Sequence, residues 1–327
     1  MGEATLEYVR LGRAGVKVSR LCLGCMNFGW RTDEDESIRI IHRALDAGVN
    51  FLDTANVYGN RGGSETIVGK ALKGRRDQVV LATKVFGEMG SGPNDRGTSR
   101  RHIMQQVEAS LRRLQTEWID LYQLHRPDPD TPMDETLSAL DDLVRQGKVR
   151  YIGTSTFPAW QLVQMLWISD RMGFERIVSE QPPYSIFDRR VETELLPACQ
   201  AHGIGVIPWS PLAGGWLAGR YRRGAPIPED ARASDPNRRK WMGLDDEKAE
   251  RRYDAVEEIE KLAKQRGVTI SQFALAWVMA HPAVTAPIIG PRTLDQLEDN
   301  LRAAEIQLSG EEKEQVDRVV PPGTSLL

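Results

Sequence analysis

The chain has 327 residues, 40% of them hydrophobic, and 43 Lys+Arg against 46 Asp+Glu give a formal charge of −3. This composition is ordinary for a globular protein and leaves open two domains or one large α/β domain. It lacks the clustered basic face that nucleic acids require. No stretch approaches the ~18 apolar residues of a membrane span, and residues 1–10 do not resemble a secretory signal. We therefore expect a cytoplasmic protein with neither nucleic acid nor membrane partners.

The first 20 residues have the pattern of a β-hairpin. Residues 6–11 and 16–20 alternate between apolar and polar side chains and are separated by Gly12 and Gly15. This hairpin precedes the repeating pattern of the rest of the chain, so we expect it to cover one end of the sheet that follows.

From residue 21 onward, short apolar runs alternate with amphipathic segments of helical period, which is typical of a parallel sheet. The expected strands are residues 21–26, 50–54, 78–84, 120–125, 149–155, 177–181, 205–210 and 286–290. The expected helices are residues 35–47, 64–72, 100–114, 134–146, 158–172, 248–265, 271–280 and 294–303. Eight strands joined through helices predict a closed (β/α)8 TIM barrel, one domain over residues 1–327.

Two local features qualify this pattern. Cys22 and Cys25 form a C-x-x-C sequence inside an expected strand, whereas redox pairs of this kind sit at helix N-termini, so we expect packed strand residues in a reducing compartment. Residues 212–246, after the seventh strand, form a long connection rich in Gly, Pro and Arg. Such a loop is usually functional, and it follows a strand at the end of the barrel where enzymes of this fold keep their chemistry.

Four reactive side chains lie at or just after the ends of adjacent strands: Asp53, Tyr58, Lys84 and His125. Each has an ordinary alternative, as a strand-end cap, a packing ring, a solvated charge or a partner of the backbone. Together they form a plausible acid, because an ammonium held by a carboxylate favours the phenolate and lowers the pKa of a neighbouring tyrosine.

The segments around these side chains resemble a known family. LDTANVYG (residues 52–59), LATK (81–84) and LHRPD (124–128) are similar, in this order, to the catalytic segments of the aldo-keto reductases. IGTSTF (152–157), SEQ (179–181), PWSPL (208–212) and IIGPRTLDQLEDN (288–300) extend the resemblance over nearly the whole chain. The match is to the bacterial branch, which is related in motif to the potassium-channel β subunits.

The resemblance implies NADPH-dependent reduction of an aldehyde or ketone on a barrel without a G-x-G-x-x-G turn, and the sequence contains no such turn. Tyr58 is then the general acid that protonates the carbonyl oxygen as hydride reaches the carbon. Lys84, paired with Asp53, lowers the pKa of Tyr58, and His125 orients the carbonyl. Donors placed at the developing oxyanion bind the transition state better than the substrate.

The resemblance also assigns contacts to NADP(H), position by position. Ser155, Thr156 and Gln181 are expected at the nicotinamide carboxamide, where the family usually has Asn in place of Thr156. Trp209 is expected on the nicotinamide ring and Arg220 at the diphosphate. Arg292, near the adenosine 2′-phosphate, favours NADPH over NADH. The full expected set is Met26, Ser155, Thr156, Gln181, Trp209, Ser210, Pro211, Leu212, Gly214, Arg220, Gly290, Arg292, Gln296, Asp299 and Asn300.

The substrate pocket is expected to include Trp30, Phe86, Met89 and Arg126, together with the 212–246 connection. Arg126 either meets a polar substrate or is an exposed loop charge. We expect no metal, because His125 is the one histidine at a strand end and no H-x-H pair accompanies it.

Two other functions remain open. One is a cofactor-binding regulatory subunit like the potassium-channel β subunits, which carry asparagine where this chain has His125. The other is a barrel aldolase that uses Lys84 as a Schiff-base amine. An aldolase needs a lysine with a lowered pKa, whereas a neighbouring Asp53 raises it.

Overall fold

The computed structural model describes residues 6–235, 239–240 and 242–327. Residues 1–5 of the predicted first segment, and residues 236–238 and 241 of the predicted long connection, lie outside the described residues. None of the helices in the described ranges is long and apolar enough to cross a membrane.

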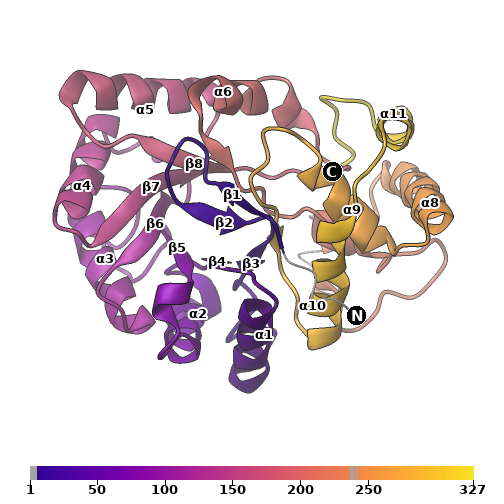
Figure 1. The fold of residues 1–327 in the computed structure, drawn as a ribbon, viewed down its shortest axis with the longest axis horizontal. Helices are drawn as coiled ribbons and strands as arrows, with labels where there is room; N and C mark the ends of the chain where they lie inside the picture. The colour runs from indigo at the N-terminus through magenta and orange to yellow at the C-terminus, as the bar shows by residue number, and fades with distance from the viewer. Residues whose placement is uncertain (1–5, 236–238, 241) are drawn as a thin grey trace.

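The N-terminal hairpin is present as predicted and closes one end of the sheet. Strands β1 (Tyr8–Arg10) and β2 (Lys17–Ser19) pair antiparallel. The turn between them is tight against the barrel, since a Cβ atom on Gly12 would lie 2.4 Å from the backbone nitrogen of Gly205. Gly12 also has a φ of +56°, which glycine adopts at no steric cost. The hairpin is the indigo ribbon that crosses the sheet in Figure 1.

The described residues contain eight parallel strands that follow one another around a curled sheet. They are β3 (Cys22–Gly24), β4 (Phe51–Asp53), β5 (Val80–Val85), β6 (Ile119–Leu124), β7 (Val149–Ser155), β8 (Ile177–Gln181), β9 (Gly205–Val206) and β10 (Ile288–Ile289). The order is β10-β3-β4-β5-β6-β7-β8-β9. Val206 bridges to Val284, and the Ile288 N–H donates to Pro208 O at 2.9 Å, so the two outer strands approach and the barrel closes. The predicted (β/α)8 barrel is confirmed.

Three strands are shorter than predicted by three residues or more, those expected at residues 21–26, 205–210 and 286–290. Pro208 and Pro287 have no N–H group with which to continue a ladder. After β3 the chain turns, and the Phe28 N–H donates to Cys25 O at 3.1 Å. Cys25, Ile207 and Ala286 are apolar and buried without belonging to a strand, so burial extends further along the chain than strand pairing does.

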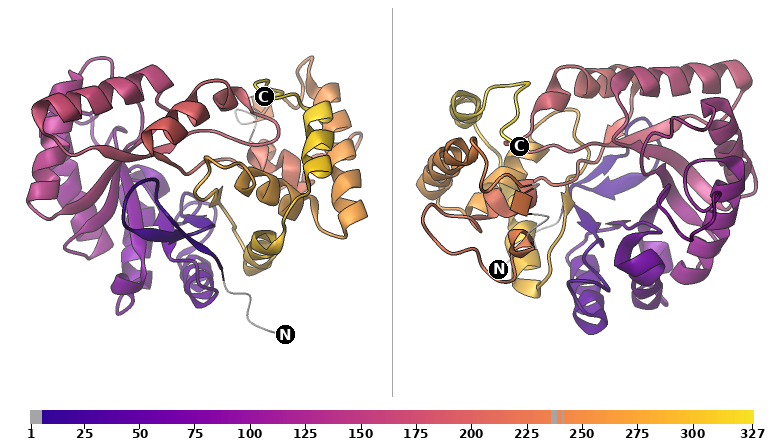
Figure 2. Two further views of the ribbon diagram at one scale, coloured as in Figure 1. Left: turned by 45° about the horizontal axis from the view of Figure 1, so that its top comes forward. Right: turned by 180° about the vertical axis from the view of Figure 1, so that it is seen from behind.

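Helices lie on the outside of the sheet in all the views (Figures 1 and 2). The α-helices are α1 (Glu34–Asp46), α2 (Tyr58–Ala71), α3 (Arg100–Leu114), α4 (Met133–Arg145), α5 (Ala159–Met172), α6 (Leu195–His202), α8 (Ala249–Arg266), α9 (Ile270–Met279), α10 (Leu294–Leu301) and α11 (Gly310–Val319). Short 3-10 helices are η1 (Arg76–Gln78), η2 (Arg190–Glu192), η3 (Ala213–Ala218), η4 (Arg232–Ser234) and η5 (Arg302–Glu305).

Helix α1 shows how the local sequence forms these elements. Asp33 caps its first turn by accepting from the Glu36 N–H, and the apolar residues Ile40, Ile41 and Ala44 make one buried face. Helices α6 and α11 were not among the predicted segments. Helix α6 is short and contains a proline, and α11 buries only Val316. The sequence signal for α11 is its capping box, which begins at Ser309.

The core has two layers. Side chains such as Phe51, Ala82 and Leu121 fill the inside of the barrel, where Leu11 and Val18 of the hairpin join them. A larger apolar layer separates the sheet from the helices.

Cys22 and Cys25 are free and fully buried, and burial raises the pKa of both thiols. A buried thiol of raised pKa is a poor nucleophile, so the geometry agrees with packed residues, Cys22 in β3 and Cys25 directly after it.

Candidate active site

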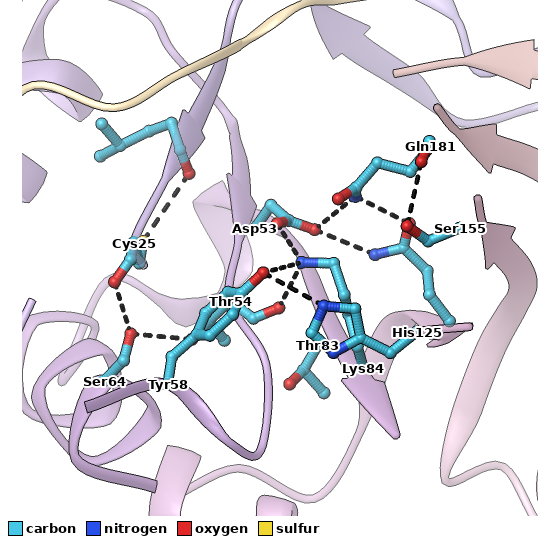
Figure 3. Close-up of polar contacts among 12 residues, drawn as sticks. Cys25, Asp53, Thr54, Tyr58, Ser64, Thr83, Lys84, His125, Ser155 and Gln181 are labelled. Carbon is cyan, nitrogen blue, oxygen red and sulfur yellow. Dashed lines mark hydrogen bonds and ion pairs between the residues drawn. The ribbon is translucent and has the colours of Figure 1, made fainter. Parts of the chain in front are cut away.

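The four reactive side chains meet at the carboxyl ends of three neighbouring strands. Asp53 ends β4, Lys84 lies near the end of β5 and His125 directly follows β6. Tyr58 is the first residue of α2, after a short turn from β4. Because these strands are parallel and adjacent, their ends open on the same face of the barrel. Figure 3 shows Lys84 beside Asp53, Thr54 and Tyr58, with a second dashed line from the Tyr58 hydroxyl to His125.

The turn that carries Tyr58 is tied to the sheet. Gly59 has a φ of +63°, and a Cβ atom there would lie 2.5 Å from the backbone nitrogen of Ser64, so only glycine fits. Ser64 Oγ donates to Cys25 O at 2.7 Å and lies 2.8 Å from Thr54 Oγ1. These bonds join the turn to the chain that follows β3 and β4, and they fix the position from which the Tyr58 ring extends.

The ammonium group of Lys84 uses all three of its hydrogens. Lys84 is fully buried and forms an ion pair with Asp53. It also donates to Thr54 O at 2.9 Å and to the Tyr58 hydroxyl at 3.4 Å. Burial alone would lower the pKa of Lys84, but the charge of Asp53 and the bonds to Asp53 and Tyr58 outweigh it and hold that pKa above its ordinary value. Lys84 is therefore a cation near neutral pH.

The Tyr58 hydroxyl stands between a cation and an imidazole. Its oxygen lies 3.4 Å from Lys84 Nζ and 3.4 Å from His125 Nε2. Burial raises the pKa of Tyr58, and the Lys84 charge lowers it only part of the way back. The prediction of a lowered tyrosine pKa is right for the contribution of Lys84 and wrong for the net direction, because burial is the larger effect. The phenol keeps its proton near neutral pH.

His125 is neutral in the same environment. Burial, followed by the charges of Lys84 and Arg126, lowers the pKa of His125 well below its ordinary value. A neutral imidazole has one N–H donor and one acceptor nitrogen. His125 can therefore donate a hydrogen bond to an oxygen without adding a positive charge to the site.

The second oxygen of Asp53 accepts two amide hydrogens. Gln123 Nε2 lies 2.9 Å from Asp53 Oδ2, and Gln181 Nε2 lies 3.0 Å from the same oxygen. Gln123 was not predicted as a site residue. Its signal in the sequence is a glutamine in an expected barrel strand, between Tyr122 and Leu124, where a buried amide needs a polar partner.

A cavity of about 950 Å³ begins above these side chains and extends to the start of α10. Asp53, Tyr58 and His125 line it, whereas Lys84 lies beneath the lining. Every residue predicted to contact the cofactor lines this cavity: Met26, Ser155, Thr156, Gln181, Trp209, Ser210, Pro211, Leu212, Gly214, Arg220, Gly290, Arg292, Gln296, Asp299 and Asn300.

The predicted substrate residues divide into two pairs. Phe86 and Arg126 line the cavity, but Trp30 and Met89 do not. Trp30 is half exposed, and the Arg31 guanidinium lies over its ring at 5.1 Å from the centroid. Met89 belongs to a turn in which its N–H donates to Asp95 O at 2.9 Å. Neither residue belongs to the cavity lining in this structure, and a substrate contact by Trp30 or Met89 stays a prediction.

The end of the cavity next to Tyr58 is lined by amide and hydroxyl groups. Ser155 Oγ donates to Gln181 O at 3.0 Å, and Thr156 Oγ1 donates to Ser155 O at 2.6 Å. Thr156 has a φ of +62°, a conformation that asparagine tolerates better than a β-branched residue. The Thr156 hydroxyl hydrogen is thus used within the protein, and its oxygen is left as an acceptor.

The other end of the cavity carries two arginines that share one carboxylate. Arg292 Nη2 lies 2.8 Å from Asp230 Oδ2, and Arg220 pairs with Asp230 Oδ1. Burial would raise the pKa of Asp230, but Arg292 and Arg220 outweigh it and hold that pKa below its ordinary value. Asp230 was not predicted; its signal is an acidic residue in a connection that is otherwise rich in arginine.

Two side chains at this end also have structural partners. Gln296 Oε1 accepts from the Arg292 N–H at 2.9 Å, which holds the turn before α10. Asp299 accepts from Thr269 Oγ1 at 3.0 Å and from Gln272 Nε2 at 2.7 Å, which ties α10 to the start of α9. These two residues line the cavity and also stabilise the helices around it.

The lining suits a dinucleotide such as NADP(H). Asn27 Oδ1, in the cavity wall, is buried without a hydrogen-bond partner, while Asn27 Nδ2 donates to Gly290 O at 3.2 Å. Cationic side chains lie at one end for phosphate groups, and Trp209 with amide groups lies at the other for an aromatic carboxamide. Within the described ranges, no group of three or more His, Cys, Asp or Glu residues is placed to hold a metal ion.

Comparisons with known proteins agree with this geometry. The model of the aldo/keto reductase family matches residues 20–321. A Bacillus subtilis protein described as an uncharacterized oxidoreductase, YrpG, is 45% identical, with 97% of each chain covered. A probable voltage-gated potassium channel subunit beta of Arabidopsis thaliana is 39% identical over 92% of each chain. A versiconal hemiacetal acetate reductase of Aspergillus parasiticus is 35% identical over 97% of this chain and 98% of the relative.

Proposed function

The chain belongs to the aldo/keto reductase family, and from this premise we propose that it is an oxidoreductase that reduces an aldehyde or ketone with NADPH. One observation carries the proposal. The protonated Tyr58 hydroxyl lies 3.4 Å from both the Lys84 ammonium and the His125 imidazole, at the floor of a cavity whose lining suits a dinucleotide. This arrangement can deliver a proton to a carbonyl oxygen beside the cofactor.

NADPH, when bound, supplies the hydride that the carbonyl carbon receives. Tyr58 gives its proton to the carbonyl oxygen, so the product is an alcohol and the tyrosine becomes a phenolate. Lys84 stabilises that phenolate because its ammonium already faces the Tyr58 oxygen, and Asp53 balances the lysine charge. Proton transfer from a positioned acid typically contributes ~10²- to 10⁴-fold to a rate.

His125 has the complementary role of orienting the substrate. Its Nε2 faces the Tyr58 hydroxyl, and the neutral ring can donate to the carbonyl oxygen that Tyr58 protonates. The edge-to-face contact of the two rings, with centroids 5.6 Å apart, supports this placement. Two donors that converge on one oxygen bind the transition state, in which that oxygen gains charge, better than the neutral carbonyl.

We assign the two ends of the cavity to the two ends of NADPH. Ser155, Thr156 and Gln181 hold the nicotinamide carboxamide in this proposal, and Trp209 stacks on its ring. Ser210, Leu212 and Arg220 hold the diphosphate. Arg292 meets the adenosine 2′-phosphate, with Gln296 and Asn300 beside it, and this contact favours NADPH over NADH.

The substrate enters beside Phe86 and Arg126, which line the same cavity near His125. Phe86 offers an apolar wall. Arg126 is exposed and donates to Thr156 Oγ1 at 3.5 Å, which leaves guanidinium hydrogens for a second partner. We therefore expect carbonyl compounds with a polar or anionic substituent among the substrates.

Two alternatives have different support. A regulatory subunit is a second candidate, because the relatives include probable channel β subunits, but the chain has histidine at position 125. The Schiff-base aldolase has little support, because the ion pair with Asp53 keeps Lys84 protonated and its pKa raised.

We still expect the protein in the cytoplasm. Its three cysteines are free and buried, which suits a reducing compartment.

The deciding experiment is a screen of small aldehydes, ketones and sugars as substrates. NADPH oxidation is measured in each case as a loss of NADPH absorbance. Steady-state turnover of one or more of these compounds is the expected result. NADPH binding without turnover of any of them would favour the regulatory subunit. If borohydride, without any nicotinamide cofactor, trapped a Schiff base between Lys84 and a carbonyl substrate, that result would favour the aldolase.

A further inference from the structure

A buried glutamine joins the catalytic carboxylate to the nicotinamide end of the cavity. Gln123 lies in β6, close to His125, and its side chain is fully buried. Its Nε2 donates to Asp53 Oδ2 at 2.9 Å, and its Oε1 accepts from Gln181 Nε2 at 3.1 Å. Gln123 does not line the cavity, whereas Asp53 and Gln181 do. Any effect of Gln123 on a bound molecule therefore passes through these two neighbours.

The contacts determine which way both amides face. Asp53, paired with the Lys84 ammonium, offers only acceptor oxygens, so the groups that face Asp53 Oδ2 are the NH2 groups of Gln123 and Gln181. The Oε1 of Gln123 then receives the second hydrogen of Gln181 Nε2. With both of its N–H groups used inside the protein, Gln181 has its Oε1 left as an acceptor for a partner in the cavity.

Two bonds hold the Gln181 amide more firmly than one. A single bond to Asp53 fixes the direction of the Gln181 NH2 group but leaves the amide free to rotate about that bond. The second bond, to Gln123 Oε1, fixes the plane of the amide as well. We propose that Gln123 is a positioning residue, which orients Gln181 so that its oxygen receives an N–H of the nicotinamide carboxamide. This inference rests on the proposed function.

The orientation of the carboxamide matters because it sets the rotation of the nicotinamide ring. A ring held in one rotation presents one face to the substrate, and reactions that need aligned atoms lose rate when the alignment loosens. The same glutamine also donates to Asp53, the partner of Lys84. Gln123 thus links the group that recognises the cofactor to the group that holds the catalytic lysine.

The first test is Gln123→Met, which keeps the length and apolar packing of the side chain but can neither donate nor accept at this position. The affinities for NADPH and for 2′,5′-ADP are measured by calorimetry, because 2′,5′-ADP lacks the nicotinamide. We expect the variant to bind NADPH about fivefold more weakly and 2′,5′-ADP unchanged, since one hydrogen bond of a buried amide is worth about that factor.

The second test is Gln123→Glu, which gives a pH-dependent result that a merely structural role would not produce. The new carboxyl would face the Asp53–Lys84 ion pair, with Tyr58 and His125 beyond it. Two carboxylates at one site do not both ionise readily. Protonated, the new group donates to Asp53 and accepts from Gln181; ionised, it repels Asp53. The ratio of NADPH to 2′,5′-ADP affinity should therefore be near wild type at low pH and fall as pH rises.

The matched control is Gln106→Met, at a second buried glutamine, on α3, whose Oε1 accepts from Asn56 Nδ2 at 3.4 Å outside this network. It should leave the affinity ratio unchanged. A Gln123→Met protein that binds NADPH and 2′,5′-ADP in the wild-type ratio would overturn the positioning role, and so would a Gln123→Glu ratio that stays flat across the pH range in which the new carboxyl ionises. If the methionine variant does not fold, the glutamate variant decides. A wild-type protein that does not bind NADPH would instead overturn the proposed function.

Discussion

The two ends of the cavity differ in how far their charged side chains are buried. At the catalytic end, Lys84 and Asp53 form an ion pair whose side chains are 0% and 4% exposed, carried by strands of the barrel. At the other end, which we propose holds the cofactor phosphates and call the phosphate end, Arg220 and Arg292 pair with Asp230, whose side chain is 57% exposed. A buried pair interacts strongly and is screened little, whereas an exposed pair is weak and exchanges partners with solvent or ligand.

This difference matches what each end must do. The catalytic end needs fixed donors, and every hydrogen of the Lys84 ammonium has a partner before substrate arrives. In the proposed function, the phosphate end needs cations that can leave one anion for another. Asp230 lies in the connection after β9 and pairs with both arginines. The comparison therefore predicts large effects at the buried end and small ones at the exposed end.

The largest effect is expected for Tyr58→Phe. Removal of the hydroxyl removes the proton donor, so kcat should fall by ~10²- to 10⁴-fold. The affinity for NADPH should not change, because the ring remains. Steady-state kinetics and calorimetry measure the two quantities. Retained turnover would place the acid elsewhere and remove the catalytic role of this end.

The comparison itself is tested by paired substitutions of the two carboxylates. Asp53→Asn leaves the Lys84 charge buried without its counterion, and the free energy of unfolding should fall by about 3–5 kcal/mol. Asp230→Asn removes an exposed partner and should cost less than about 1 kcal/mol. Urea denaturation of both variants and the wild type gives the numbers. Equal losses would contradict the division into a rigid and an exchangeable end.

A smaller and more selective effect is expected for Arg292→Ala. Loss of a charge-assisted bond to the 2′-phosphate should weaken NADPH binding by about 10- to 100-fold, and NADH binding should stay the same. Fluorescence quenching of the tryptophans reports both affinities. If NADPH and NADH lose affinity equally, Arg292 does not read the 2′-phosphate.

The smallest effect is expected for pH, since kcat should not change with pH near neutrality. In the proposed function, reduction needs protonated Tyr58 and neutral His125. The pKa of Tyr58 is raised above its ordinary value of 10.0, so the active form is lost only as pH rises beyond that value. The pKa of His125 is lowered well below 6.5, so the inactive form appears only far to the acid side. The kcat profile should be flat between these limits, and a step near neutral pH would show that one of these groups titrates there.

Much of the fold followed from periodicity. The eight strand segments, the N-terminal hairpin and most helices are read from apolar runs, helical faces and glycine stops, because those signals are local. The lengths of β3, β9 and β10 are not, since pairing depends on neighbouring strands while apolar character follows burial. Helix α6, with its short apolar sequence, lacks a helical period strong enough to separate it from a strand.

The candidate site divides in the same way. By itself, the sequence determined that Asp53, Lys84 and His125 stand at neighbouring strand ends, because a parallel barrel brings those ends to one face. Only the tertiary structure decided that Gln123 bonds to Asp53 and Gln181, that Asp230 joins two arginines, and that Trp30 lies outside the cavity. The tertiary structure also decided that the pKa of Tyr58 is raised and not lowered from its ordinary value. Partners from distant parts of the chain, and the burial that sets a pKa, arise from packing in three dimensions and leave no local pattern in the order of residues.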